Sequence, residues 1–142
     1  MKNALLSCLV LMLAAGALLA EPAPGTPAAS GRVFELRTYT SSPGKLDALN
    51  ARFRDHTIAL FKKHGMEVVG FWEPVDKENG AGERLIYMLA HKSRAAAEDS
   101  WKSCRDDPEW VKVKGDSEKD GGSLTTKIES VFLAGTDYSP LK

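Results

Sequence analysis

The sequence predicts one α+β domain whose elements follow the order βαββαβ. Three observations lead to it: segments rich in β-branched and aromatic residues near both ends of the domain, two stretches with helical spacing, and a hairpin signal between two apolar runs. The 142 residues, of which 43% are hydrophobic and 27% charged, leave room for one domain. Basic and acidic residues are equal, 19 of each, and form no concentrated positive face, which argues against nucleic acid as a partner.

Residues 1–20 have the pattern of a secretory signal peptide. A basic start at Lys2 precedes an apolar run from Ala4 to Ala20, and a polar break follows at Glu21. The alternative is an uncleaved membrane anchor, because Leu18 stands where a small residue is preferred and the run is near the lower limit for a span. No basic cluster follows to stop transfer, so we expect cleavage and an exported protein, periplasmic or secreted, that contacts a membrane only if the leader stays.

A flexible linker is predicted for residues 21–32, which carry three prolines and no large apolar side chain, and the domain itself for residues 33–142. The first strand is predicted at 33–40, where β-branched and aromatic residues end at the turn signal 41–44. Apolar side chains then recur at three- and four-residue steps over 45–64 and predict the first helix, which Gly65 ends.

A β-hairpin is predicted from two apolar runs, 66–75 and 85–90, that flank the turn signal Asn79-Gly80. In the second strand, regular alternation puts Val68 and Trp72 on one side of the sheet, opposite Val69 and Phe71. The hairpin therefore forms the second and third strands of the chain, and their apolar side chains lie on both faces of the sheet.

The second half of the domain begins with a helix at 94–104, for which Ser93 is the cap. Asp107-Pro108 then starts a further turn. The polar segment 115–122 is interpreted as a solvated loop, with a mobile lid as the alternative, and a last strand is predicted at 124–134.

This element order is that of a ferredoxin-like fold, an antiparallel four-stranded sheet with both helices on one face. Two helices cover only one face of a sheet, and a solvated second face normally alternates apolar with polar side chains. Because both faces are apolar here, we expect the uncovered face to pack against a second copy of the chain, and predict a homodimer.

Three groups of residues resemble segments of the NIPSNAP family, in the right order: Phe34-Glu35-Leu36-Arg37-Thr38-Tyr39-Thr40 with Pro43-Gly44-Lys45, Gly65-Met66 with Gly70-Phe71-Trp72, and Asp107-Pro108-Glu109-Trp110. The resemblance covers residues 33–134 and, with the leader, points to a bacterial secreted type. It implies a dimeric α+β barrel fold, a superfamily that also contains small monooxygenases, haem-degrading enzymes and dismutases. It implies no particular reaction, since these domains share no agreed activity, and no catalytic residues are carried over.

His56 is the candidate catalytic base. By the helical repeat it lies within about 50° of the apolar stripe, so its imidazole is expected to face the sheet or the cleft beside it. The alternative is a structural histidine that donates to a backbone carbonyl. Cys104 is the only cysteine left after removal of the leader, so it has no disulfide partner, and an inert buried thiol is favoured over a reactive one.

Candidate ligand-binding residues lie on the first strand and among the aromatic side chains. Arg37 shares one face of the strand with Glu35 and Tyr39, and this charged pair is expected either as a salt bridge at the dimer seam, the favoured reading, or as an anion clamp in a pocket. Trp72 and Trp101, together with Tyr39, are candidate walls of an aromatic cavity, although aromatic residues of a small domain usually form its core.

No metal site or nucleotide loop is indicated, because the histidines have no ligand spacing and no glycine-rich loop opens a helix. No cofactor is therefore predicted; haem stays open, since His91 or His56 could act alone as an axial ligand. Two functions follow: a homodimer that binds a small, partly apolar molecule in a cleft between sheet and helices, with metal-free oxygenase or isomerase chemistry, or a non-catalytic module that binds another envelope protein.

Overall fold

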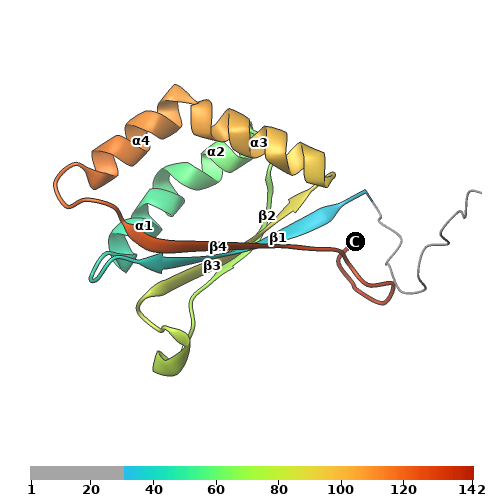
Figure 1. The fold of residues 1–142 in the computed structure, drawn as a ribbon, viewed down its shortest axis with the longest axis horizontal. Helices are drawn as coiled ribbons and strands as arrows, with labels where there is room; N and C mark the ends of the chain where they lie inside the picture. The colour runs from blue at the N-terminus through green and yellow to red at the C-terminus, as the bar shows by residue number, and fades with distance from the viewer. Residues whose placement is uncertain (1–30) are drawn as a thin grey trace, which may run out of the picture.

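The computed structural model describes residues 31–142, so the predicted signal peptide and nearly all of the predicted linker lie outside the described residues. Four antiparallel strands form one sheet in the order β2-β3-β1-β4, and the helices cover one of its faces (Figure 1). This confirms the ferredoxin-like arrangement. The elements are β1 Val33–Ser41, α1 Leu46–Arg52, a π-helical turn η1 Phe53–Thr57, α2 Ile58–Lys63, β2 Glu67–Trp72, a 3₁₀ turn η2 Lys77–Asn79, β3 Arg84–His91, α3 Arg94–Asp106, α4 Pro108–Glu118 and β4 Thr125–Leu133.

The first helix is continuous, as expected over 45–64, but the π-helical turn η1 interrupts its α-helical repeat. A π-turn holds one more residue than an α-turn, so side chains after it are rotated relative to the stripe before it. Phe53 and Thr57 consequently face the sheet and are buried, whereas His56 between them is exposed. The helix ends at Gly65, whose φ of 74° is the left-handed conformation that glycine adopts most readily.

Strand β2 contains a register shift between Val68 and Gly70, a β-bulge against β3. A bulge adds one unpaired residue and so reverses the faces of the side chains beyond it. Phe71 pairs with Tyr87 and packs in the core together with Val68, whereas Trp72 turns to the other face and is 49% exposed. The prediction that Val68 and Trp72 share a face is therefore wrong.

Two helices, rather than one helix and a turn, follow β3. Ser93 caps α3 as predicted, with its Oγ accepting from the backbone N–H of Ala96, and Asp107 caps α4 with its carboxylate accepting from Glu109. The expected turn after Pro108 is in fact eleven residues of helix, so the first half of the expected loop 115–122 is helical. Contacts with the first helix support α4, because the buried Arg52 pairs with Glu118 at 3.0 Å.

The core lies between the sheet and the helices and is dominated by aromatic rings packed edge to face or tilted. Phe53 occupies its centre, with ring centroids at 5.2–6.1 Å from those of four others, Tyr39, Phe61, Phe71 and Tyr87. Cys104 from α3 is buried against the same cluster, as predicted. Edge-to-face packing stabilises such pairs beyond their burial from water.

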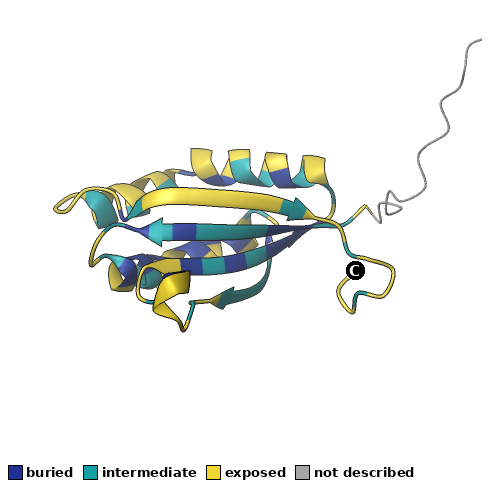
Figure 2. Ribbon diagram, turned by 60° about the horizontal axis from the view of Figure 1, so that its bottom comes forward, coloured by how far each residue is buried: buried dark blue, intermediate teal, exposed yellow. Residues whose placement is uncertain are grey.

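The opposite face of the sheet has no helix over it (Figure 2). Its exposed apolar side chains include Trp72 on β2 and both Val131 and Leu133 on β4. The segment after β4 folds back over one end of this face, where Leu141 lies near Phe34 and the Arg32 guanidinium donates to the backbone carbonyl of Lys142. Among residues 31–142, no helix combines the length and apolar character needed to cross a bilayer.

Candidate functional site

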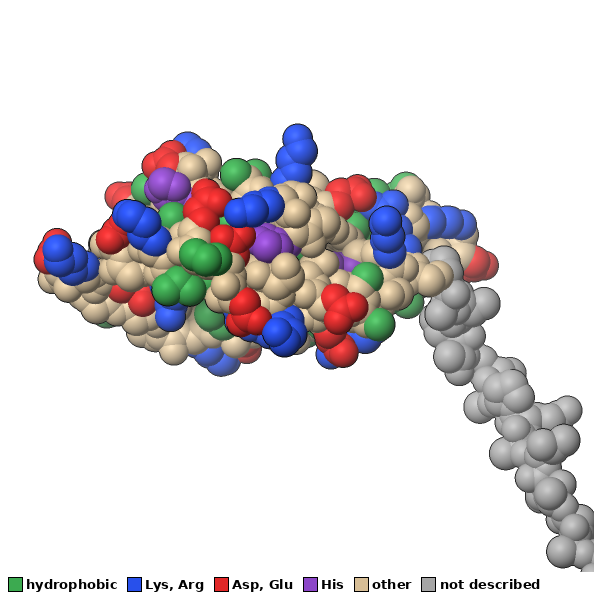
Figure 3. Space-filling model, turned by 90° about the horizontal axis from the view of Figure 1, so that it is seen from above, with side chains coloured by type: hydrophobic (Ala, Val, Ile, Leu, Met, Phe, Trp, Pro, Cys, Tyr) green, Lys and Arg blue, Asp and Glu red, His purple; other side chains and the backbone are tan. Residues whose placement is uncertain are grey.

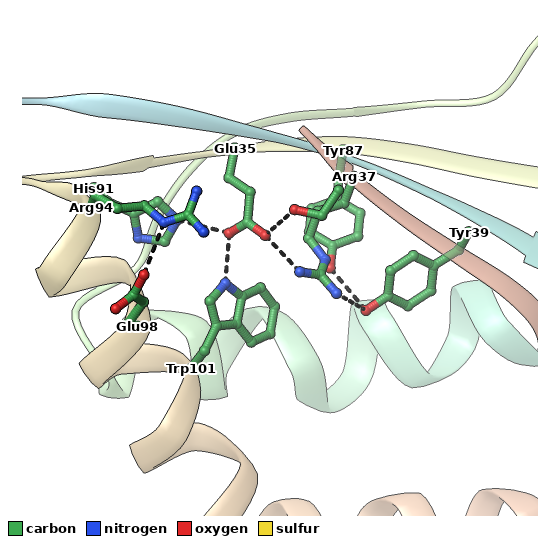
Figure 4. Close-up of polar contacts among 9 residues, drawn as sticks. Glu35, Arg37, Tyr39, Tyr87, His91, Arg94, Glu98 and Trp101 are labelled. Carbon is green, nitrogen blue, oxygen red and sulfur yellow. Dashed lines mark hydrogen bonds and ion pairs between the residues drawn. The ribbon is translucent and has the colours of Figure 1, made fainter. Parts of the chain in front are cut away.

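A buried carboxylate lies at the centre of the helix-covered face of the sheet. Glu35 of β1 is 1% exposed, and its two oxygens accept four hydrogen bonds from side chains of β1, β3, β4 and α3 (Figure 4). The donors and their distances are Arg37 at 2.6 Å, Ser130 at 2.6 Å, His91 at 3.1 Å and Trp101 at 2.6 Å. A charge is tolerated in such a position only when it is paired and hydrogen-bonded, and Glu35 meets both conditions.

Arg37 connects this carboxylate to the aromatic core. One guanidinium nitrogen donates to Glu35 and another donates to the Tyr39 hydroxyl at 3.4 Å, while the Cζ atom lies 4.3 Å from the centroid of the Trp101 ring. Tyr39 also accepts from the hydroxyl of the fully buried Tyr87 at 3.1 Å. The pair Glu35–Arg37 thus lies beneath α3 on the helix-covered face, and not on the open face where the sequence led us to expect a dimer seam.

The network keeps Glu35 and Arg37 charged and Tyr87 neutral. Burial alone would raise the pKa of Glu35, but hydrogen bonds from His91, Ser130, Trp101 and Arg37 outweigh it and lower this pKa from 4.5 to about 2. Burial alone would lower the pKa of Arg37, but its neighbours raise it, and burial raises the pKa of Tyr87 far above its ordinary value. At neutral pH the site therefore contains an ion pair beside the protonated phenol of Tyr87.

Acid should destabilise the fold through two carboxylates. Besides Glu35, Asp107 has its pKa lowered from 3.8 to about 2, mainly by Lys63 and then by the Glu109 backbone N–H and His64. Both groups bind protons more readily in the unfolded chain, so their contribution is complete above pH 4.5 and is lost as pH falls toward 2. Urea unfolding at neutral pH and at several values between 4.5 and 2 should show a steadily falling free energy of unfolding.

The Asp107→Asn variant separates the two carboxylates, since most of its remaining acid dependence belongs to Glu35. Asp106, Asp116 and Glu129 also have lowered pKa values, but their ion pairs are exposed and contribute little. A free energy of unfolding that is constant from neutral pH down to 3 would contradict the assignment of a lowered pKa to both groups.

A cavity of about 210 Å³ lies beside this network, between β1, β4 and the helices. Five of its eleven lining residues are aromatic, and Arg37, Tyr39 and Thr57 add residues with polar groups from the sheet and the first helix. Its volume is below the ~300 Å³ of the smallest drug-sized sites, so it fits a small molecule. The full lining set is Arg37, Tyr39, Phe53, Thr57, Phe61, Trp101, Cys104, Arg105, Trp110, Lys114 and Ile128.

The cavity opens at the edge of the sheet. Ile128 of β4 pairs with Tyr39 and so faces the helices, yet it is 49% exposed because no helix covers it. Arg105 of α3 and Lys114 of α4 are exposed on the other side of the opening. Ligand access therefore runs between β4 and the junction of α3 with α4.

The structure brings three of the predicted site residues, Arg37, Tyr39 and Trp101, to this cavity and leaves two elsewhere. His56 is exposed and lines a shallow groove between η1 and α4, because the π-turn rotates it away from the sheet. Trp72 lies on the open face, because the bulge in β2 reverses its side. The assignments of His56 as base in the cleft and of Trp72 as a wall of the same site are both wrong.

Sequence reasoning also missed residues of the site. Thr57 faces the sheet at the position where the regular α-helical repeat would put His56. No signal in the sequence marks the extra residue of a π-turn. Arg105 and Lys114 were missed because the sequence predicts a turn and a loop where the structure has α4. The signal that could have found Lys114 is the cap pattern Asp107-Pro108, which is also typical of the start of a full helix.

The residues at the cavity do not fit haem. None of the described residues that line it is a histidine, His91 is 1% exposed and bonded to Glu35, and a volume of about 210 Å³ is small for a tetrapyrrole. Within residues 31–142, no three His, Cys, Asp or Glu side chains converge as metal ligands do. On the helix side of the molecule, positive and negative side chains are interspersed, and neither sign forms a large patch (Figure 3).

The whole domain is similar to solved structures of several bacterial proteins. A NIPSNAP family protein of unknown function from Agrobacterium tumefaciens has 21% identity and a TM-score of 0.67, with 82% of this chain and 98% of that chain covered. An uncharacterised NIPSNAP-like protein from Burkholderia xenovorans has 14% identity and a TM-score of 0.67, with 79% and 91% covered. A proposed antibiotic biosynthesis monooxygenase from Nitrosomonas europaea has 12% identity and a TM-score of 0.54, with 78% and 96% covered.

These likenesses establish the fold, which is the α+β arrangement of the dimeric α+β barrel proteins. No curated protein matches the sequence. The NIPSNAP family model matches residues 34–140, which is nearly all of the described domain and well over half of the chain. On this match, the chain belongs to the NIPSNAP family.

Proposed function

We propose that the domain binds a small, partly apolar molecule in the cavity between the sheet and the helices. The observation that carries this proposal is a cavity of about 210 Å³ whose wall combines aromatic rings with a few polar groups, the composition typical of small-molecule sites. Trp101 and Trp110 supply flat apolar surface, while the Arg37 guanidinium and the Tyr39 hydroxyl offer hydrogen bonds. The Glu35 network holds Arg37 and Trp101 in place before a ligand arrives.

Binding, rather than a named reaction, is what the geometry supports best. Metal-free isomerase or oxygenase chemistry needs a group that moves a proton at the substrate, and His56 lies outside the cavity. Tyr39 does line the cavity, and its hydroxyl lies within hydrogen-bond distance of Arg37 and Tyr87. If chemistry occurs here, Tyr39 is the residue to replace first, by Phe, which keeps the ring.

Narrowing the mouth of the cavity should weaken binding strongly without unfolding the domain. Ile128→Tyr places a larger ring at a half-exposed position of the opening, and we expect affinity for small neutral aromatic probes to fall at least tenfold. Phenol, benzyl alcohol and phenylacetamide are suitable probes. The measurement is a titration followed by the indole N–H resonances of Trp101 and Trp110, which lie at the cavity, with Trp72 on the opposite face as an internal control.

The matched control is Val111→Tyr, which adds the same ring to an exposed position of α4 away from the cavity. This variant should bind like the unchanged protein. Probes that perturb Trp72 but not Trp101 and Trp110, or that perturb none of the three at millimolar concentration, would count against the proposed site.

The open face of the sheet is proposed to pack against a second copy of the domain. Its exposed apolar side chains, Trp72, Val131 and Leu133, are contiguous with the partly buried Leu36 and Met88. Most charged side chains around them are paired, as in Arg32–Glu67 and Lys127–Glu129, which leaves Arg84 as the unpaired charge of the described strands on this face, so only a small net charge opposes an identical face.

Val131→Lys should convert the expected dimer into a monomer, because a second copy would bury the added charge without a partner. Light scattering coupled to size-exclusion chromatography gives the molar mass directly. Val111→Lys on the helix side, at a similarly exposed position, should leave the dimer intact. An unchanged protein that is monomeric at micromolar concentration would refute the dimer.

Export is proposed from residues 1–20 alone. To test it, the whole chain is expressed in cells and the N-terminal sequence of the recovered protein is determined. Cleavage after Ala20 leaves Glu21 as the first residue, whereas a chain that still begins before Ala4 has kept the leader as an anchor.

A further inference from the structure

The wall of the cavity has an uneven charge. Three of its residues, Arg37, Arg105 and Lys114, are cations, and none of the described residues that line it is acidic. At the apolar end, the buried Phe61 and the partly buried Trp101 lie with ring centroids 5.5 Å apart, whereas Arg105 and Lys114 are exposed at the mouth. The cavity is therefore amphipathic, with an aromatic interior and a positive entrance.

The three cations are not equally available to a ligand. Glu35 neutralises Arg37 through a contact of 2.6 Å, so the guanidinium presents hydrogen-bond donors but little net charge. Arg105, in contrast, forms no ion pair with any other residue of the range 31–142. It is the cation whose charge a ligand can satisfy.

Lys114 is nearly as free. Its Nζ lies 3.9 Å from Glu118, but that carboxylate is already held at 3.0 Å by the buried Arg52. An exposed ion pair at the longer distance contributes little. Uncompensated positive charge at this opening thus comes from Arg105 and Lys114 together, on two helices that the cap residue Asp107 joins.

We propose that the cavity is selective for small aromatic carboxylates, with the ring between Trp101 and Trp110 and the carboxylate at the mouth beside Arg105 and Lys114. This inference rests on the proposed binding function and names the class of ligand. A carboxylate at the mouth keeps part of its hydration, so it gains from two cations without the full cost of burial. The ring fills the aromatic interior, where offset and edge-on contacts favour flat groups over branched ones.

The test compares two probes of the same size, phenylacetate and its uncharged analogue phenylacetamide. Titrations at neutral pH, followed by the indole N–H resonances of Trp101 and Trp110, should show that the acid binds at least tenfold more tightly. This preference should fall about tenfold in the double variant Arg105→Gln/Lys114→Gln. The double variant Lys102→Gln/Lys112→Gln removes the same charge from exposed positions of the same two helices and should keep the preference.

The outcomes separate this inference from the proposed function. Equal affinity for the two probes, or a preference that survives in Arg105→Gln/Lys114→Gln, would overturn the carboxylate selectivity while leaving a small-molecule site. Absence of any perturbation at Trp101 and Trp110 by either probe at millimolar concentration would count against the site itself. Both double variants change only exposed side chains, and an unaltered melting temperature will show that they fold.

Discussion

Glu35→Ala should lower the free energy of unfolding by about 3–5 kcal/mol, since it leaves the charge of Arg37 without its partner inside the fold. Three further donors, from Ser130, His91 and Trp101, lose their acceptor at the same time. Single domains are stable by about 5–15 kcal/mol, so this one substitution removes a large part of the total. Urea unfolding followed by far-ultraviolet circular dichroism gives the difference.

Glu67→Ala is the matched control. Glu67 is also a glutamate of the sheet paired with an arginine, but its side chain is 68% exposed, and a change within about 0.5 kcal/mol is expected. The double variant Glu35→Leu/Arg37→Met should recover part of the loss, because an apolar pair of similar volume leaves no unpaired charge. A loss below about 1 kcal/mol in Glu35→Ala would show that the carboxylate is not what organises these donors.

Phe53→Ala should cost about 3–5 kcal/mol, the usual range for removal of a buried phenylalanine ring. The ring is 4% exposed and contacts the rings of Tyr39, Phe61, Phe71 and Tyr87, so its loss leaves a hole that four neighbours cannot fill without moving. It also forms one wall of the cavity. Chemical unfolding should therefore show a much lower midpoint, with the slope unchanged if the folded state stays compact.

Val111→Ala provides the comparison, because Val111 is 61% exposed and its truncation should change the free energy of unfolding by less than about 0.5 kcal/mol. If Phe53→Ala were equally neutral, the aromatic cluster would not be the source of stability that its burial indicates.

The elements that the sequence predicted well are those with a local physical cause. β-branched and aromatic residues define β1, Ser93 caps α3, and Gly65 ends the first helix with the backbone conformation expected of it. Alternation along β1 correctly placed Glu35, Arg37 and Tyr39 on one face of the sheet. Such features depend on near neighbours in the chain, so one sequence suffices to find them.

The errors arose where one extra residue changes the phase of a repeat. The π-turn before Ile58 moved His56 out of the cleft, and the bulge between Val68 and Gly70 moved Trp72 to the open face. Both irregularities depend on packing between elements rather than on local propensity, so the periodic pattern cannot reveal them. Helix α4 was missed for a related reason: none of its residues is fully buried, so it has no clear apolar stripe. Contacts with other elements hold it, namely the packing of Trp110 against the core and the pair Arg52–Glu118.

The contact between Arg32 and the backbone of Lys142 brings both ends of the described domain to one point of its surface. Figure 1 shows this point at the end of the sheet away from α4 and its connection to β4. A carrier, tag or solid support joined at either end would leave from the same place and would not obstruct the opening between β4 and the helices. Circular permutation is feasible for the same reason, since a short peptide could join the two ends and new termini could be cut in the exposed turn after Val75.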